Sequence, residues 1–412
     1  MNHTTTIQEP AAGPVTPSQV GIRAFLRHEL KPKGPLLTPF NVVSIPVMLA
    51  AAVILFFRFK DGLGAVTNLS QEFPWGVWKG FNVVSGVAFA GGAYIITFAV
   101  YVMNAKKYRP LVRVTVLNGL LAYMFYAGAL VLELGRPWNI FNPIIGNDFG
   151  YNSVLFLIAW HFLLYMIAEA VEFSPAVAEW LEKWRLERFL HTLTLGAVIF
   201  GFTLSTLHQS GLGVLFLMAK PKIHPLWYSE FIPLLFFVSS IFAGLAMVIV
   251  EGTLSRRFLR DHIEADPERF REMVFGLARG AALSMFVYYF FKLVLFLHDG
   301  HWAHLDGPWG AWFLVEVIGL VLVPCFLFAF GVRNRSFGLI RIAAILTIAG
   351  VLMNRLNVSL IAFGWNAPVH YVPKWTEVVV ALAILFAQIW VFRWVLLRMP
   401  VYPKKGEPAL PA

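Results

Sequence analysis

The sequence has little charge for its length. Only 14% of its 412 residues are charged and 58% are hydrophobic, whereas a soluble domain carries about a quarter charged residues. Apolar windows of about 20 residues recur along the chain, which is the helix length needed to cross the hydrocarbon core of a bilayer. The composition excludes an ordinary soluble protein and predicts an all-α polytopic membrane protein.

Cysteine is almost absent. Cys325 is the single cysteine and lies within an apolar stretch. One thiol neither ligates an iron–sulfur cluster nor closes an internal disulfide, and the sequence has no C-x-x-C-H motif for covalent haem attachment. We therefore interpret Cys325 as a small core residue and expect no iron–sulfur cluster in this chain.

Hydropathy predicts ten transmembrane helices. Their ranges are 41–59, 79–103, 111–133, 151–171, 190–218, 228–251, 277–298, 309–331, 338–363 and 376–398. Because consecutive helices with short connections pack as neighbours, we expect two four-helix bundles and two peripheral helices. The corresponding units are a tail at 1–40, a peripheral helix at 41–59, a first bundle at 79–218, a second bundle at 228–363, a last helix at 376–398 and a tail at 399–412.

Positive charge is distributed unevenly over the predicted loops. The net charge is +10, and most of the 33 Lys and Arg residues fall in the two tails and in the loops after even-numbered spans. Such loops face the cytoplasm, so both termini are predicted to be cytoplasmic in a bacterial inner membrane. The amphipathic stretch GIRAFLRHELKPKGPLL leads into the first span. The charge follows membrane topology and does not indicate nucleic-acid binding.

The opposite, outer loops are rich in Trp, Tyr, Pro and His. Examples are HDGHWAHLDGPWG and WNAPVHYVPKW. Aromatic residues of this kind form a belt at the membrane–water interface. The same surface also suits a partner protein docked outside the cytoplasm, and the sequence leaves both interpretations open.

Polar side chains interrupt four consecutive spans of the first bundle. An ionisable group inside a span is costly, so it indicates a partner or a function. Counting along the alternating spans places most of these groups near the outer face and predicts one polar pocket there. The candidates are Asn82, Glu133, Arg136, His161, His208 and Gln209. The structural alternative for the acid is a helix-end ion pair between Glu133 and Arg136.

A second set of charges lies in the outer half of spans seven to nine. It consists of Lys292, Glu316 and Arg355. These residues form either a buried ion-pair cluster or a proton path, and the sequence favours neither strongly. Glu169 and Glu251 fall instead near the cytoplasmic ends of their spans, where a solvated interface explains them.

An acid, an imidazole and an amide in an apolar bundle suit a quinone. The ring and the isoprenoid tail need apolar walls, the carbonyl oxygens need donors, and reduction needs two protons with two electrons. Glu133 and His208 are the candidates for proton transfer, with menaquinone or ubiquinone as the substrate. Haem b is the competing ligand, and His161 with His208 is the only plausible axial pair.

Four motifs resemble those of a known family. They are PWGVWKGFNVVSGVAFAGGAY, LELGRPWNIFNP, LSTLHQSGLG and LMNRLNVS. Together, over roughly residues 20–400, the chain resembles the NrfD/polysulfide-reductase membrane subunits, in particular the HybB-like subunits of hydrogenase-2 type complexes. The resemblance implies a haem-free, quinone-reactive subunit with Glu133, Arg136 and His208 at the quinone or proton-transfer site. The family often has an acidic residue at the position of Asn82, which puts a proton-carrying role of span two in doubt.

The resemblance also implies partners. An extracytoplasmic ferredoxin-like iron–sulfur subunit would pass electrons from a catalytic subunit, such as a hydrogenase, to the quinone. Two other hypotheses stay open: a proton or ion transporter that uses the charges of the second bundle, and an inert membrane anchor for an outer complex. The sequence does not identify the electron donor, the quinone or the direction of electron flow.

Overall fold

The computed structural model of the chain describes residues 16–146, 150, 152–258 and 266–402. This part contains 10 helices that are long and apolar enough to cross a membrane. It has no β-strand, only an isolated bridge between Ile223 and Phe363. The predicted all-α, ten-span architecture is therefore confirmed.

Several spans are composites of more than one helical segment. In chain order the spans are α3 (Pro39–Asp61); η1, α5 and α6 (Trp78–Ser85, Gly86–Phe89 and Gly91–Tyr101); η2 with α7 (Lys106–Tyr108 and Arg109–Glu133); α9 (Val154–Trp180); α10 (Trp184–Leu217); α11 (Ile232–Phe258); α12 (Pro267–Asp299); α13, η6 and α14 (Pro308–Leu314, Val315–Leu322 and Val323–Arg333); α15 with η7 (Phe337–Leu356 and Asn357–Ile361); and α16 (Trp375–Leu396). The shorter helices are α1 (Pro17–Val20), α2 (Ile22–Glu29), α4 (Leu63–Val66), η3 (Pro137–Phe141), α8 (Asn142–Ile145), η4 (Lys220–Lys222) and η5 (His301–His304).

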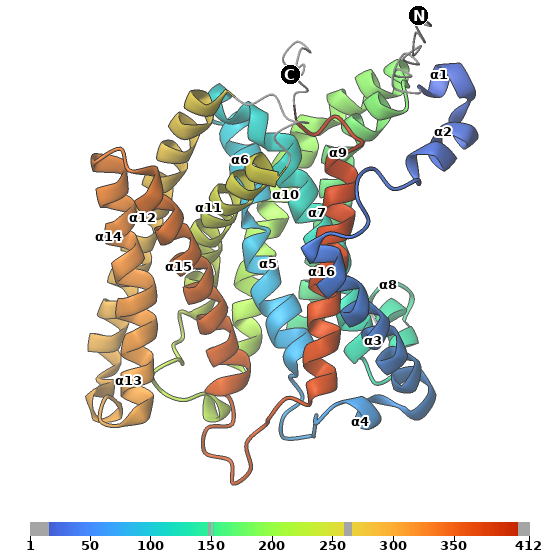
Figure 1. The fold of residues 1–412 in the computed structure, drawn as a ribbon. Helices are drawn as coiled ribbons and strands as arrows, with labels where there is room; N and C mark the ends of the chain where they lie inside the picture. Colours follow the sequence, from blue (N-terminus) through green and yellow to red (C-terminus); the bar gives the residue numbers. More distant parts are fainter. Residues whose placement is uncertain (1–15, 147–149, 151, 259–265, 403–412) are drawn as a thin grey trace, which may run out of the picture.

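The spans are arranged as two helix bundles joined side by side (Figure 1). Helices α6, α7, α9 and α10 pack together in the first bundle, and α11, α12, α14 and α15 pack together in the second. Helix α11 also packs against α6 and α10, and α16 packs against both α3 and α7. Helices α1 and α2 lie at one end of the bundles, and α4 and α13 lie at the opposite end, which the charge distribution predicts to face outward and which is called the outer end below (Figure 1).

Glycines bring the two bundles into direct backbone contact. A Cβ built on Gly91 would lie 2.4 Å from the Ser240 carbonyl oxygen, and one on Gly244 would lie 2.1 Å from the Gly92 nitrogen. No side chain fits at these positions, because real Cβ atoms do not approach so closely. Small residues at helix crossings are how membrane helices pack without water to drive them together.

Part of the predicted N-terminal tail is folded. Helix α2 docks on the bundle through the ring of Phe25, whose centroid is 5.1 Å from that of Trp180, and Arg398 Nε donates a 2.6 Å hydrogen bond to the Glu29 carbonyl. The amphipathic stretch that leads into the first span therefore packs against the bundle. Residues 1–15 and 403–412 of the two predicted tails lie outside the described residues.

Three spans contain a π-helical segment in place of regular α-helix. These segments are η1, η6 and η7, and they carry the polar residues Lys79 and Asn82, Glu316, and Asn357 respectively. A π-helical turn inserts one extra residue into a helix and occurs frequently at functional sites. The three π-helical segments therefore indicate candidate functional sites in the outer halves of both bundles.

Candidate functional site

The Glu133 carboxylate is buried at the outer end of the first bundle. Glu133 is the last residue of α7 and is 2% exposed. Its Oε1 accepts a 3.0 Å hydrogen bond from the Gly76 amide and lies 3.4 Å from Lys79 Nζ. Its Oε2 has no hydrogen-bond partner among the residues that the structure describes. One carboxylate oxygen is thus fixed, while the other is free to bind a further group or exchange a proton.

Lys79 links this buried acid to the outer surface. Its side chain is 22% exposed, and its Nζ donates a 3.2 Å hydrogen bond to the Pro74 carbonyl. The ammonium also lies 5.8 Å from the centre of the Trp75 ring, which packs against Phe216 of α10 at 5.3 Å. The Lys79 ammonium, which neutralises Glu133, therefore lies between the Trp75 ring and the outer end of the protein.

Arg136 is not the partner of Glu133. It is exposed at the start of η3, and no ion pair joins the two residues within the described chain. Arg58 of α3 occupies the end of α7 instead: it is 3% exposed, its Nε donates a 2.7 Å bond to the Leu132 carbonyl, and its Nη2 donates to the Leu134 carbonyl. An arginine at this point satisfies carbonyls that a helix end leaves without partners.

Arg58 was missed by the sequence analysis. Arg58 lies in the last turn of an apolar span. An arginine at that position is also typical of an ordinary charge at the membrane interface, so its role at the end of α7 could not be predicted. Asn82 was predicted to line the pocket, but its Nδ2 donates a 3.3 Å bond to the Ala381 carbonyl of α16. Asn82 therefore joins two helices, and no contact brings it to Glu133.

His208 occupies a second, deeper position. It is 1% exposed, and its ring centroid lies 5.6 Å from that of Tyr123 and 5.3 Å from that of Phe162. Tyr123 precedes Glu133 by ten residues on α7, or about 15 Å along the helix axis. The prediction that His208 and Glu133 lie at one depth is wrong. Helix α10 continues for nine residues beyond His208, whereas α7 ends at Glu133, so counting along the chain placed His208 too near the surface.

Buried polar atoms without partners continue inward from His208. Within the described part of the chain, hydrogen bonds are lacking at both ring nitrogens of His208, at the hydroxyls of Tyr123, Tyr165 and Ser205, and at both carboxylate oxygens of Glu169. All these residues are at most 1% exposed. The rings of Tyr123 and Tyr165 are 4.6 Å apart, which makes the group continuous. Ordered water is the usual partner of such groups in protein interiors.

Two further residues shape this inner group. Gln209 Nε2 donates a 2.9 Å bond to the Val87 carbonyl, so Gln209 ties α10 to α5. A Cβ on Gly119 would lie 2.1 Å from Glu169 Oε1, so this glycine makes the space for the acid. Glu169 was interpreted as solvated from the sequence, and that interpretation is wrong because α9 continues past Glu169 to Trp180 and α7 packs against the acid at Gly119.

The histidines do not form a convincing axial pair for haem. His161 of α9 interacts electrostatically with His208, but the rings of Tyr123 and Phe162 lie directly against His208. An axial ligand needs an open space for the macrocycle beside its nitrogen, and these aromatic rings occupy the surroundings of His208. Separately, no group of three or more His, Cys, Asp or Glu side chains is arranged to hold a metal ion among the described residues.

The acid of the second bundle is held by neutral donors. Glu316 is 1% exposed. Its Oε1 accepts a 2.7 Å bond from Asn354 Nδ2, and its Oε2 accepts bonds of 2.7 Å from Trp227 Nε1 and 2.6 Å from Asn357 Nδ2. Both oxygens are therefore satisfied, by residues from the loop before α11, from α15 and from η7.

Arg355 and Lys292 lie near Glu316 without pairing with it. Arg355 Nη2 donates bonds of 2.7 Å to Ser239 Oγ and 3.0 Å to the Phe236 carbonyl, and Nη1 donates a 3.1 Å bond to Asn354 Oδ1. Lys292 Nζ lies 5.3 Å from the centre of the Phe313 ring. No ion pair joins the three charges in the part of the chain that the structure describes. The three charges therefore form a cluster without a direct ion pair, and Asn354 bridges the acid and the guanidinium.

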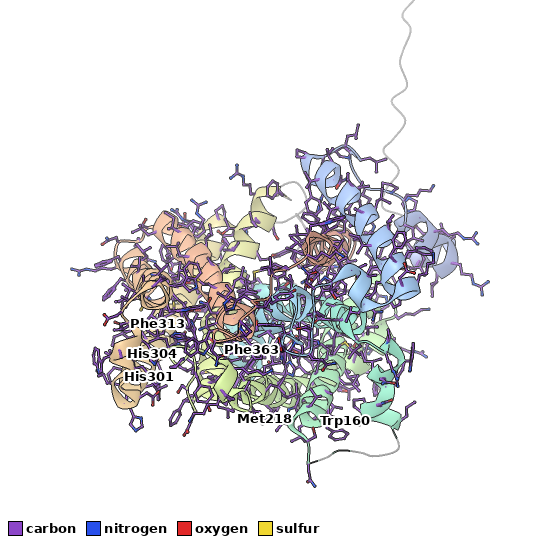
Figure 2. The ribbon with its side chains drawn as sticks, turned by 90° about the horizontal axis from the view of Figure 1, so that it is seen from below. Trp160, Met218, His301, His304, Phe313 and Phe363 are labelled. Atoms are coloured by element: carbon purple, nitrogen blue, oxygen red, sulfur yellow. The ribbon has the colours of Figure 1, made fainter. Side chains whose placement is uncertain are left out.

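Histidines and tryptophans of the outer loops gather into one cluster. His224 is 2% exposed, with ring centroids 5.4 Å from His304, 5.1 Å from Trp309 and 4.7 Å from Trp365. Burial and the nearby charges of His304 and His301 lower the pKa of His224 to about 4. Figure 2 shows His301 and His304 beside Phe313 at one edge of the outer face, with Phe363 nearer its centre. Side chains from different outer loops therefore pack against one another, in addition to any contact with the membrane interface.

Comparison with known proteins agrees with this architecture. The family profile described as Polysulphide reductase, NrfD matches residues 65–367. The chain is 30% identical to the probable Ni/Fe-hydrogenase 2 b-type cytochrome subunit of Escherichia coli, over 92% of this chain and 96% of the relative. It is 40% identical to a protein of Nitratidesulfovibrio vulgaris, over 89% and 95% of the two chains. It is also 24% identical to the Hdr-like menaquinol oxidoreductase integral membrane subunit of Archaeoglobus fulgidus, over 70% and 68%. The chain belongs to the NrfD polysulphide-reductase family of integral membrane subunits.

Proposed function

We propose that the chain is the quinone-reactive membrane subunit of a hydrogenase-linked respiratory oxidoreductase. The observation that carries the proposal is the buried Glu133 carboxylate, with Oε1 fixed by the Gly76 amide and Lys79 and with Oε2 free. A free, oriented oxygen in an apolar bundle suits one oxygen of a quinone head group. The names of the relatives, a hydrogenase 2 subunit and a menaquinol oxidoreductase subunit, support a quinone and favour menaquinone.

The chemistry requires two electrons and two protons for each quinone. In the reducing direction, Glu133 Oε2 delivers a proton to a quinone oxygen as electrons arrive, and the reverse step removes a proton from the quinol. Lys79 Nζ, 3.4 Å from Oε1, balances the charge of the carboxylate after the proton has left. The free Oε2 atom is the group that binds and moves the proton.

The buried polar residues around His208 supply and accept protons in this proposal. His208 has two ring nitrogens without partners, and Tyr123, Ser205 and Tyr165 continue from it to Glu169. Imidazole and carboxylate groups bridged by hydroxyls and ordered water are suited to proton transfer. Glu133 is then the proton carrier that contacts the quinone, and His208 acts about 15 Å deeper.

The outer loops are proposed to dock an extracytoplasmic iron–sulfur subunit that brings the electrons. The positive-inside distribution of Lys and Arg supports cytoplasmic termini and an outer face at the opposite end, in a bacterial inner membrane. Large apolar side chains are exposed on η3 and α8, which follow Glu133, and at the start of α16 with the loop before it. They are Trp138, Phe141, Ile145, Val369, Val372 and Trp375. A partner seated there places its iron–sulfur centre next to the quinone site.

The test separates quinone chemistry from the rest of the complex. Glu133→Gln and His208→Phe are introduced into the intact membrane complex, and turnover is compared with a water-soluble naphthoquinone and with an artificial redox dye that accepts electrons before the membrane. We expect the quinone-linked activity to fall at least about 100-fold for Glu133→Gln while the dye-linked activity is unchanged. Unchanged quinone-linked activity in both variants would favour an inert anchor and overturn the proposal.

The second bundle supports a further candidate function, proton or ion translocation. Glu316, Asn354 and Arg355 form a continuous buried polar group, and Lys292 is buried without an ion-pair partner in the described chain. Buried charges of this kind often mark ion pathways in membrane proteins. Proton flux through the purified subunit in liposomes, lost in Lys292→Met, would support translocation. Absence of any flux with or without quinone turnover would exclude it.

A further inference from the structure

Gly76 separates two buried carboxylates. A Cβ built on Gly76 would lie 3.3 Å from Glu133 Oε1 and 3.2 Å from Oε2 of Glu377, an acid in the first turn of α16. Glu377 is 1% exposed. Two buried acids therefore approach the same backbone position from different helices. The sequence analysis did not identify Glu377, which stands at the start of a span like an ordinary interfacial charge.

The hydrogen bonds of Glu377 hold the segment that precedes η1. Its Oε1 accepts a 2.8 Å bond from the Asn68 amide, and its backbone carbonyl accepts a 2.8 Å bond from Trp78 Nε1. These contacts fix both ends of residues 68–78, the segment that contains Gly76. The same Oε1 also accepts a 3.1 Å bond from the Lys374 amide, which is the ordinary bond of a helix start.

Tyr371 connects Glu377 to the residue next to Gly76. The Tyr371 hydroxyl donates to Glu377 Oε2 and accepts a 3.3 Å bond from the Val77 amide. Burial, the hydrogen bond to Glu377 and the negative charges of Glu377 and Glu133 raise the pKa of Tyr371 above its ordinary value. The hydroxyl therefore keeps its proton and remains a donor to Glu377.

Glu377 and Glu133 differ in whether a carboxylate oxygen remains without a hydrogen bond. Glu377 accepts hydrogen bonds at both oxygens, from Asn68, Lys374 and Tyr371. Glu133 is bonded only at Oε1, and Oε2 is without a partner. The first is suited to hold structure and the second to exchange a proton.

We propose that Glu377 and Tyr371 are positioning residues for Glu133: they fix residues 68–78 so that the Gly76 amide and Lys79 hold Oε1 and direct Oε2 toward the quinone. The inference rests on the proposed function, because it assigns a role to residues behind the same site. It also links the quinone site to α16, a helix outside the first bundle. The chemistry itself stays with Glu133.

The test measures binding of a ligand that needs no partner subunit. A fluorescent quinolone N-oxide, an inhibitor of quinone sites, is titrated into the purified full-length chain in detergent. We expect Glu133→Gln to weaken binding about tenfold, because it removes a charge-assisted hydrogen bond. We expect Glu377→Gln and Tyr371→Phe each to weaken binding about fivefold, and the double variants with Glu133→Gln to be no weaker than Glu133→Gln alone.

The control is Thr376→Val. Thr376 Oγ1 donates a 2.5 Å bond from the start of α16 to the Val66 carbonyl, so it joins the same two parts of the chain without reaching Gly76. Thermal unfolding of every variant shows whether it is folded, and Tyr371→Phe keeps the ring if Glu377→Gln fails to fold. Thr376→Val should bind the inhibitor like the unaltered protein.

The possible contrary outcomes overturn different statements. Unaltered inhibitor binding in Glu133→Gln overturns the proposed quinone site itself. Weakened binding in Glu133→Gln with normal binding in both Glu377→Gln and Tyr371→Phe overturns only the positioning role. Losses that multiply in the double variants, or an equal loss in Thr376→Val, would show a general structural effect and also overturn it.

Discussion

Lys79 Nζ lies 3.4 Å from Glu133 Oε1, and this pair joins a π-helical segment of span two to the end of span three. The lysine is partly exposed and the acid is buried. The pair therefore places one charge at the outer surface and the other inside the bundle, next to a carboxylate oxygen that remains free.

Removing the lysine charge should impair quinone chemistry. We expect Lys79→Gln to lower quinone-linked turnover about tenfold to 100-fold, because a charge-assisted bond of about 1.5–3 kcal/mol is lost beside Glu133. Turnover is measured in the intact complex with a water-soluble naphthoquinone. Lys220→Gln is the control, since Lys220 is an outer lysine with a 65% exposed side chain. Equal turnover in the two variants would contradict the role of Lys79.

Glu169 should matter more than another buried acid at the same end of the protein. If protons reach His208 through Tyr165 and Ser205, Glu169→Gln should lower quinone-linked turnover about tenfold. Glu251→Gln is the matched control, because Glu251 is also buried with both oxygens unpaired but belongs to α11. An equal loss in both variants would indicate a general effect of buried acids and exclude this route.

Glu316→Gln should destabilise the second bundle. The amide nitrogen of glutamine cannot accept the bonds from Trp227 and Asn357, so a buried donor loses its partner at a cost of about 1–3 kcal/mol. Thermal unfolding in detergent measures the change, and Glu230→Gln serves as the control because the Glu230 side chain is 78% exposed. A melting temperature equal to that of the control would show that Glu316 is not the centre of the network.

The outer histidine cluster should make stability depend on pH. The pKa of His224 is lowered to about 4 in the folded protein, whereas histidine in an unfolded chain has a pKa of about 6.5. The unfolded state therefore binds the proton first, and stability should fall as the pH decreases from about 6.5 to about 4.

His224→Asn tests this origin of the pH dependence. Asparagine retains an acceptor for the Leu226 amide, which donates to His224 Nδ1 at 3.2 Å, but it does not titrate. Melting temperatures at pH 7 and pH 5 should differ less in this variant than in the unaltered protein. His370→Asn, at an exposed histidine of the loop before α16, should leave the difference unchanged. The reverse pattern would assign the effect to another group.

The contact between the bundles should tolerate no added methyl group. Gly244→Ala places a Cβ 2.1 Å from the Gly92 nitrogen, and the overpacking should cost about 1–3 kcal/mol or more. Gly128→Ala in α7 is the control, because no atom lies within 4 Å of its added Cβ. Thermal unfolding should show a large loss for the first and almost none for the second. Similar behaviour of both would mean that the bundles separate without cost.

The spans and several polar residues could be predicted because both are local properties of the chain. Each span is a continuous apolar run, and Glu133, His208 and Glu316 stand out because an ionisable residue interrupts such a run. Their partners could not be predicted in the same way. The alternative ion pair of Glu133 with Arg136 is not formed, and Glu316 has no direct ion pair with Lys292 or Arg355 in the described chain, since charge and sequence proximity do not say which donors the folded helices bring to an acid.

Depth was predicted poorly for a related reason. Helix α9 continues past the predicted end of its span, to Trp180. Helix α10 carries nine residues beyond His208, whereas α7 ends at Glu133, so the position of a residue within an apolar run does not give its level in the bundle. His208 moved inward to Tyr123, and Glu169 became buried instead of solvated.

The sequence by itself determined an all-α membrane protein with ten spans, because the cost of exposing backbone and polar groups to lipid restricts an apolar run to a helix. Only the tertiary structure decided that the carboxylates of Glu133 and Glu377 approach each other at Gly76. Glu133 ends one helix and Glu377 begins another, far along the chain, and their approach depends on how α7 and α16 pack. That packing is set by side-chain contacts between distant segments, which no local pattern in the sequence records.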